Sequence, residues 1–126
     1  MHILIVDDED NIRFVLKYNL ELDGHTVVEA KHGEEALEVA SQDLDLILLD
    51  VMMPTMNGIE ACQKLKQNPH TKDIPIVMLT AKSQLLDIEE AFRAGADDYL
   101  TKPFEPDEIS NKIETKLSNI LKARSE

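Results

Sequence analysis

The sequence contains one cysteine, no tryptophan and no long hydrophobic run. Cys62 alone cannot form an internal disulfide, which is typical of proteins from the reducing cytosol. No apolar run approaches the ~18 residues that a membrane-spanning helix needs. The N-terminal residues 1–8 have neither the basic stretch nor the cleavage site of a signal peptide. These absences predict a cytoplasmic domain without a membrane segment.

Positive charge is also scarce, because 13 Lys and Arg residues face 25 Asp and Glu residues, for a net charge of −12. A nucleic acid duplex would repel such a protein, so we expect no direct nucleic acid binding by this chain. The glycine-rich phosphate-binding pattern of nucleotide hydrolases is missing.

The four histidines are His2, His25, His32 and His70. They lack the spacing of metal ligands, so we predict no transition-metal site.

Two hydrophobic periodicities alternate along the chain. Short aliphatic runs typical of buried strands lie at 3–6, 26–28, 46–49, 76–79 and, more weakly, 98–101. Between these runs, apolar residues recur at helical spacing. We expect Phe92 on the inward stripe of the fourth helix and Pro106 in the first turn of the fifth. Five strand–helix units with uniformly apolar strands predict one α/β domain, a doubly wound parallel sheet with helices on both faces.

Carboxylates follow the two most apolar strands. Asp7 and Asp8 come after "ILIV", and Asp50 comes after "LILL". Because parallel strands end at one edge of a sheet, we expect these residues to lie near Thr80 and Lys102, which end later strands. Neighbouring carboxylates at ~4 Å repel by about 4 kcal/mol at an effective dielectric near 20, so either a cation must offset the repulsion or protons must bind. An all-oxygen cluster suits Mg²⁺, and a carboxylate beside it can accept a phosphoryl group.

Four motifs, taken in order, resemble those of bacterial two-component response-regulator receiver domains. They are "VDDE" at 6–9, "LLDVMMPTMNG" at 48–58, "VMLTA" at 77–81 and "GADDYLTKPF" at 95–104. The resemblance implies a flavodoxin-like sheet with strand order 2-1-3-4-5. It also implies a receiver domain over residues 1–122, with residues 123–126 as a C-terminal tail. Such a domain is a phosphorylation-dependent switch rather than a turnover enzyme, and a sensor histidine kinase supplies its phosphoryl group.

The resemblance assigns the phosphoryl and metal chemistry to particular residues. Asp50 matches the phosphoacceptor of the family and one of its Mg²⁺ ligands. Asp8 matches the direct Mg²⁺ ligand, and Asp7 matches a ligand that acts largely through water. The backbone carbonyl of Met52 matches the remaining protein ligand.

The resemblance also identifies the residues of the switch. Thr80 and the Ala81 amide match groups that contact the phosphoryl oxygens, and Lys102 matches the lysine that pairs with one of them. The family usually has a cis peptide bond before the proline that corresponds to Pro103. Tyr99 matches the aromatic residue that turns inward when the threonine moves. The face of the fourth helix, fifth strand and fifth helix would then meet an output domain or protein partner.

Some positions differ from the family pattern. Met52 and Lys82 stand at positions that tune the lifetime of the phosphoryl group, and an apolar Met52 predicts a long lifetime. Receivers that dimerise through the face just described usually carry arginines on the fifth helix. Lys112 and Lys116 occupy that helix here, which leaves homodimerisation open. Whether the chain is a stand-alone receiver or a piece of a longer regulator is open as well.

Other interpretations of these residues remain. Asp7, Asp8 and Glu9 are also suited to capping the first helix, and Tyr99 to plain core packing. A haloacid-type Mg²⁺ phosphatase also forms an aspartyl phosphate, but it needs a second catalytic aspartate, and we expect Asp10 to begin the first helix instead. A flavodoxin-like FMN module would need a phosphate cradle, whereas the first loop, "DDEDN", is anionic.

Overall fold

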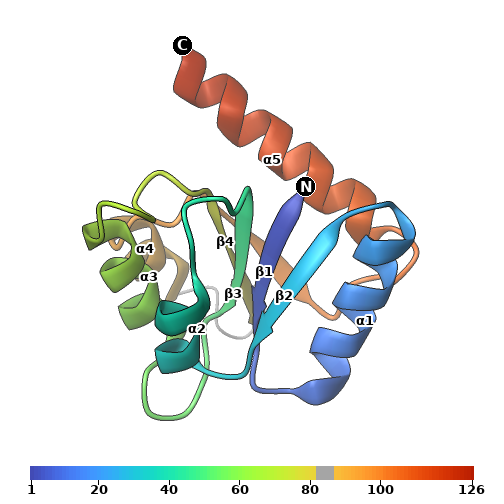
Figure 1. Ribbon diagram of the computed structural model, residues 1–126, viewed down its shortest axis with the longest axis horizontal. Coiled ribbons are helices and arrows are strands. Elements are labelled where there is room, and N and C mark those ends of the chain that lie inside the picture. The colour runs from blue at the N-terminus through green and yellow to red at the C-terminus, as the bar shows by residue number, and fades with distance from the viewer. Residues whose placement is uncertain (82–86) are drawn as a thin grey trace.

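A parallel sheet of five strands runs through the centre of the molecule, in the order β2-β1-β3-β4-β5 (Figure 1). The computed structural model describes residues 1–81 and 87–126. The strands are β1 (His2–Val6), β2 (Thr26–Ala30), β3 (Leu46–Asp50), β4 (Ile76–Ala81) and β5 (Asp98–Lys102). Each neighbouring pair is parallel, so the predicted doubly wound topology and strand order are confirmed.

Helices cover both faces of this sheet, as the alternation of the sequence predicts. Figure 1 shows α1 and α5 on one side of the sheet and α2, α3 and α4 on the other. In the described part of the chain, the helices are α1 (Asp10–Leu22), α2 (Gly33–Val39), α3 (Gly58–Gln67), α4 (Asp87–Arg93) and α5 (Ile109–Ser125). None of these helices combines the length and the apolar character that crossing a membrane requires.

The core has two halves because side chains alternate across each strand. In β1, Leu4 and Val6 pack with apolar residues of α2, α3 and α4. Ile3 and Ile5 point the other way, toward apolar residues of α1 and α5. All five residues of β3 are buried, which explains why this strand is a continuous apolar run that ends in a buried Asp50.

Two local predictions were wrong. Phe92 does not lie on the buried stripe of α4: its exposed fraction is 44%, and its ring meets Tyr99 edge-on with 6.4 Å between the ring centroids. Pro106 does not lie in the first turn of α5, which begins only at Ile109. A separate turn precedes the helix, in which the amide of Glu108 donates to the carbonyl of Glu105 at 3.0 Å.

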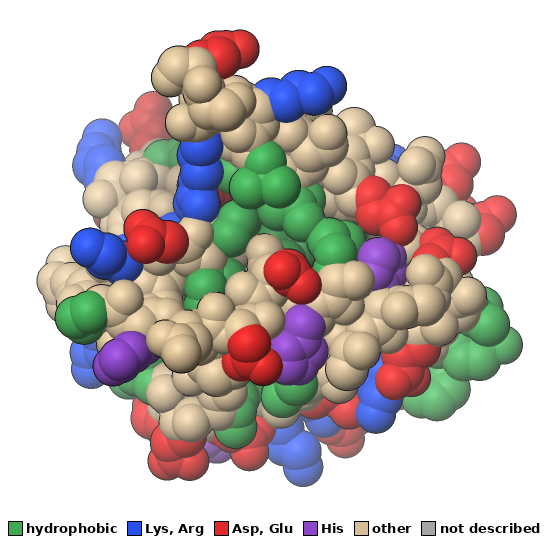
Figure 2. Space-filling model, turned by 45° about the horizontal axis from the view of Figure 1, so that its top comes forward, with side chains coloured by type: hydrophobic (Ala, Val, Ile, Leu, Met, Phe, Trp, Pro, Cys, Tyr) green, Lys and Arg blue, Asp and Glu red, His purple; other side chains and the backbone are tan. Residues whose placement is uncertain are grey.

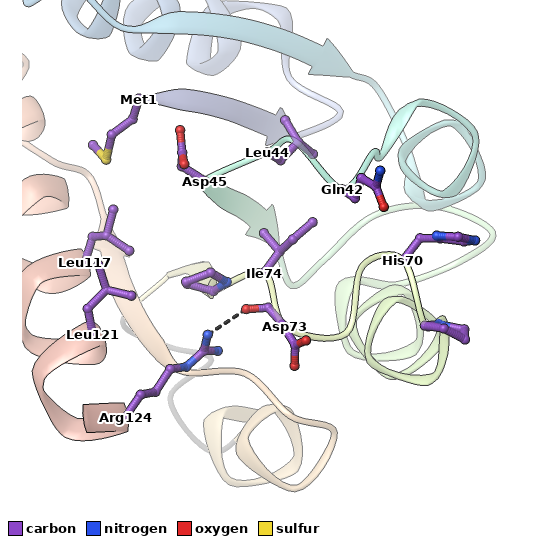
Figure 3. A pocket seen from close by; sticks show the side chains of 12 residues that line it. Met1, Gln42, Leu44, Asp45, His70, Asp73, Ile74, Leu117, Leu121 and Arg124 are labelled. Atoms are coloured by element: carbon purple, nitrogen blue, oxygen red, sulfur yellow. Dashed lines mark hydrogen bonds between the residues drawn. The ribbon is translucent and has the colours of Figure 1, made fainter. Parts of the chain in front are cut away.

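A pocket of about 680 Å³ lies at the N-terminal ends of the strands, beside the last turns of α5. Figure 2 shows this side of the molecule, with a hollow floored by hydrophobic side chains. In Figure 3, Leu44, Ile74 and Leu117 point into the pocket, and Arg124 donates to the backbone carbonyl of Asp73 at 2.6 Å. The pocket is therefore separate from Asp7, Asp8 and Asp50, which lie at the opposite ends of the strands.

Candidate functional site

Three carboxylates meet where β1 and β3 end. One oxygen of Asp7, one of Asp8 and one of Asp50 lie within 4.8 Å of one another. Asp7 is fully buried and Asp50 is 4% exposed, whereas Asp8 is exposed to solvent. The two strands are direct neighbours in the sheet, so both aspartate sites lie at the same edge. A cluster of oxygen donors that is buried on one side and open on the other fits Mg²⁺, which keeps several of its waters.

Lys102 joins this cluster from the end of β5. Its ammonium lies 2.7 Å from Asp7 Oδ2, 3.3 Å from Asp50 Oδ1 and 3.9 Å from Glu9 Oε1. Burial works to lower the pKa of Lys102, but the hydrogen bond to Asp7 and the charge of Asp50 outweigh it and leave the pKa raised. The lysine therefore carries a fixed positive charge at the site. The peptide bond between Lys102 and Pro103 is cis, as the resemblance implies.

The carboxyl group of Asp50 is the one whose ionisation the site alters most. Burial, as the largest cause, and the neighbouring charge of Asp7 raise its pKa from 3.8 to about 7, although Lys102 opposes the rise. Near neutral pH, without a metal ion, this carboxyl group therefore holds a proton for much of the time. A divalent cation would favour the ionised form, which is the form that can act as a nucleophile.

A small pocket of about 190 Å³ opens beside Asp50. Its other lining residues come from different segments: Glu9 precedes α1, Met52 follows β3, Ala81 ends β4 and Lys102 ends β5. The side chain of Met52 is 54% exposed and stands at the mouth of the site. The pocket thus places a carboxylate, an ammonium and backbone groups around one small volume.

Thr80 and Tyr99 lie on neighbouring strands but in different surroundings. Thr80 is fully buried at the end of β4, where its hydroxyl donates to the carbonyl of Ala81 at 3.2 Å. Tyr99 is half-buried in β5, and the ammonium of Lys116 lies 5.6 Å from the centre of its ring. Tyr99 thus belongs to the face formed by α4, β5 and α5.

Lys82, the second position predicted to tune phosphoryl lifetime, lies outside the described residues.

Sequence reasoning did not identify Arg13 as part of the site. This arginine lies on α1 with only 6% of its surface exposed, and it donates to the backbone carbonyl of Asp7. It also forms an ion pair with Asp10, the first residue of α1. The only signal in the sequence is the three-residue spacing of Asp10 and Arg13, which is common on exposed helices.

Comparisons with known proteins agree on one family. The model of the response regulator receiver domain family matches residues 3–114. The alkaline phosphatase synthesis transcriptional regulatory protein PhoP of Bacillus subtilis (strain 168) is 48% identical over 112 residues, which are 88% of this chain and 46% of PhoP. The chain thus spans about half the length of the curated relatives it matches.

Solved structures show the same similarity. The chemotaxis response regulator CheY4 of Vibrio cholerae is 32% identical, with a TM-score of 0.82 over 91% of this chain and 97% of that chain. The receiver domain of sensor histidine kinase PA1611 from Pseudomonas aeruginosa is 28% identical, with a TM-score of 0.81 over 93% of this chain and 97% of that chain. The PA1611 structure has a magnesium ion coordinated in its active site cleft.

Proposed function

The chain belongs to the response regulator receiver domain family, and from this premise we propose that Asp50 accepts a phosphoryl group in a Mg²⁺-dependent reaction. The observation that carries the proposal is the placement of Asp50 between an acidic cluster and the ammonium of Lys102, at the edge of an open pocket. One carboxylate oxygen of Asp50 attacks phosphorus, and the bond from phosphorus to the donor breaks. The donor leaves with the bonding electrons.

The geometry favours Asp50 over the other two aspartates. Both carboxylate oxygens of Asp7 already accept hydrogen bonds, one from the Glu9 amide at 2.9 Å and one from Lys102 at 2.7 Å. Asp7 is also fully buried, so a phosphoryl donor has no access to it. Asp8 is exposed and stands on the outer side of the cluster. Asp50 alone of the three lines the pocket.

Asp7, Asp8, Asp50 and the backbone carbonyl of Met52 are the groups that would hold Mg²⁺. The magnesium-bound receiver domain of PA1611 supports this part of the proposal. When bound, Mg²⁺ neutralises the charge of the phosphoryl oxygens and of the acidic cluster. Lys102 pairs with a further phosphoryl oxygen, and Asp50 stays aligned because β3 is buried on both faces. Alignment and charge neutralisation are the main requirements of phosphoryl transfer.

Phosphorylation then shifts a conformational equilibrium. The hydroxyl of Thr80 exchanges the Ala81 carbonyl for a phosphoryl oxygen, and Tyr99 turns inward and leaves its present contacts with Phe92 and Lys116. A shift from 1:99 to 99:1 requires about 5.5 kcal/mol of differential interaction, which two charge-assisted contacts together with a bound divalent cation would supply. The rearranged face of α4, β5 and α5 meets an output domain, a protein partner or a second copy of the chain.

A histidine kinase in the cytoplasm is the proposed phosphoryl donor. The surface of α1 offers it a place to dock, because Phe14, Tyr18 and Leu22 are 69%, 56% and 66% exposed on successive turns. The rings of Phe14 and Tyr18 stack with 6.1 Å between their centroids. This apolar strip begins one turn after Asp10, at the end of α1 that adjoins the acidic cluster.

The decisive experiment is intact-protein mass spectrometry after incubation with acetyl phosphate and Mg²⁺. We expect one added phosphoryl group on the parent protein, none on Asp50→Asn, and none on the parent protein in EDTA. Asp45→Asn is the matched control. The carboxylate of Asp45 accepts a hydrogen bond from the amide of His2 at the other end of the sheet, so this substitution should not affect labelling. Equal labelling of Asp50→Asn and the parent protein would show that another residue is the acceptor.

The phosphatase alternative loses support from the position of Asp10. Its carboxylate pairs with Arg13 at the start of α1, and Asp10 is outside the group of residues that lines the pocket. We therefore expect no turnover of p-nitrophenyl phosphate by the purified chain. Steady release of p-nitrophenol that disappears in Asp10→Asn would favour the phosphatase instead.

A further inference from the structure

We propose that Arg13 is a positioning residue of the Mg²⁺ site, because its guanidinium fixes the peptide group that joins Asp7 to Asp8. This inference rests on the proposed function. Arg13 Nη1 donates to the backbone carbonyl oxygen of Asp7 at 2.7 Å. The peptide unit is planar, so a hydrogen bond that holds this oxygen also sets the direction in which the chain enters Asp8.

Asp7 is held at each of its polar groups. Its amide donates to the carbonyl of Ala30 at 3.2 Å, and its carboxylate accepts hydrogen bonds from Glu9 and Lys102. Arg13 adds the remaining restraint, the one on the carbonyl group. Asp8 is exposed, and its carboxylate reaches the cluster only if the backbone before it has the right orientation. Arg13 therefore acts on Asp8 through the backbone.

The guanidinium is itself fixed from two further directions. Asp10 pairs with it from the preceding turn of α1, and Glu29 of β2 lies 3.3 Å from its Nε. Lys17 holds the same glutamate at 3.5 Å. A guanidinium presents five donors in a rigid plane, so its contacts with a carbonyl and two carboxylates fix its orientation, whereas an ammonium is a compact charge whose three donors rotate freely. Through these contacts Arg13 connects β2 to the loop that carries Asp7 and Asp8.

If Arg13 had a purely structural role, its contacts between α1 and β2 would contribute to the free energy of unfolding and would not affect Mg²⁺ affinity. Lys66 is a suitable reference for that role, since it is also a largely buried cation that ties loops together. Its ammonium donates to the carbonyls of Lys72 and Ile74 at 3.2 and 2.8 Å, and it lies 3.3 Å from Asp97. None of these contacts involves the acidic cluster. Lys66→Gln thus removes a comparable tie without altering the metal site.

The test is Mg²⁺ titration calorimetry on unphosphorylated parent protein, Arg13→Gln, Arg13→Lys and Lys66→Gln, with urea unfolding in EDTA to record the stability of each. Partners behind metal ligands typically contribute 10- to 100-fold to metal affinity, so we expect Arg13→Gln to weaken Mg²⁺ binding about tenfold. Arg13→Lys should weaken it several-fold, and Lys66→Gln less than about twofold. With acetyl phosphate, Arg13→Gln should need more Mg²⁺ but approach the parent rate at saturation.

Each outcome decides the matter. Parent-like Mg²⁺ affinity in both arginine variants overturns the inference, and so does an equal loss of affinity in Lys66→Gln. If Arg13→Gln does not fold, Arg13→Lys carries the same test. A parent protein that labels at Asp50 while the Arg13 variants bind Mg²⁺ normally leaves the proposed function standing and removes only the role of Arg13. A parent protein that binds no Mg²⁺ removes both.

Discussion

A β-carbon added to Gly58 would lie 2.0 Å from the backbone carbonyl oxygen of Asp50. The first residue of α3 is thus packed directly on the end of β3, and its amide donates to the carbonyl of Val51 at 2.8 Å. Real β-carbons do not approach a backbone atom so closely, so in a substituted protein the start of α3 or the end of β3, which carries the proposed phosphoacceptor, has to shift. The position of Asp50 therefore depends on the absence of a side chain at Gly58.

We expect Gly58→Ala to lower the free energy of unfolding by about 3 kcal/mol and to slow labelling by acetyl phosphate, because the end of β3 must shift. Gly33→Ala is the matched control. Gly33 also begins a helix, α2, but its added β-carbon would meet the flexible side chain of Met56 at 2.9 Å. That variant should lose under about 1 kcal/mol and label normally. Urea unfolding and mass spectrometry measure both effects, and equal losses in the two variants would refute the expectation.

Much of the site follows from the sequence because strand ends have a simple geometry. Asp50 and Lys102 are far apart in the chain, yet each ends a strand, and parallel strands place such ends at one edge. The family motifs then fix which residue matches which role. The same logic placed Asp7 and Asp8 beside them, since β1 and β3 are neighbours.

Features that depend on backbone contacts were beyond sequence reasoning. The proposed role of Arg13 rests on a carbonyl acceptor, and every residue has a carbonyl, so the contact leaves no pattern in the sequence. The close approach of Gly58 to Asp50 is hidden for the same reason. Phe92 was misplaced because a short helix has too few residues to define the edge of its apolar stripe. Pro106 was misplaced because proline suits a turn before a helix as well as the first turn within it.

The raised pKa of Asp50 predicts a specific dependence of stability on pH. In the unfolded chain its pKa is near 3.8, and in the folded protein it is about 7. Between these values the unfolded state has lost a proton that the folded state retains, so the contribution of Asp50 to stability falls as pH rises from 4 to 7 and is constant above. The whole difference is on the order of 4 kcal/mol.

Asp50→Asn removes this dependence. Without Mg²⁺, we expect the variant to be more stable than the parent protein by about 2 kcal/mol at pH 8, since part of the gain is offset by the lost contact with Lys102. The difference should shrink toward pH 5. Asp107→Asn, a change at an exposed position before α5, should keep the parent slope. Urea unfolding in EDTA across this pH range measures the effect, and parallel curves for Asp50→Asn and the parent protein would contradict it.

Met52 predicts a long-lived phosphoryl group. Hydrolysis of an aspartyl phosphate requires a water molecule aligned with phosphorus, and a polar side chain beside the site can orient that water. The side chain of Met52 is exposed at the mouth of the pocket next to Asp50, where it offers an attacking water only a weak thioether acceptor. We therefore expect Met52→Asn to accelerate loss of the phosphoryl group several-fold.

Met52→Leu separates this effect from a mere change of shape, because leucine keeps an apolar side chain of similar size. It should retain the slow hydrolysis of the parent protein, and neither variant should change the Mg²⁺ affinity, since the proposed ligand at this position is the backbone carbonyl. First-order decay of the purified phosphoprotein, followed by mass spectrometry, gives the rates. If the phosphorylated Met52→Asn variant loses its phosphoryl group at the parent rate, residues other than Met52 set the lifetime. If Met52→Leu accelerates the loss as much as Met52→Asn does, the access of water to the phosphoryl group controls the rate, and the orientation of that water does not.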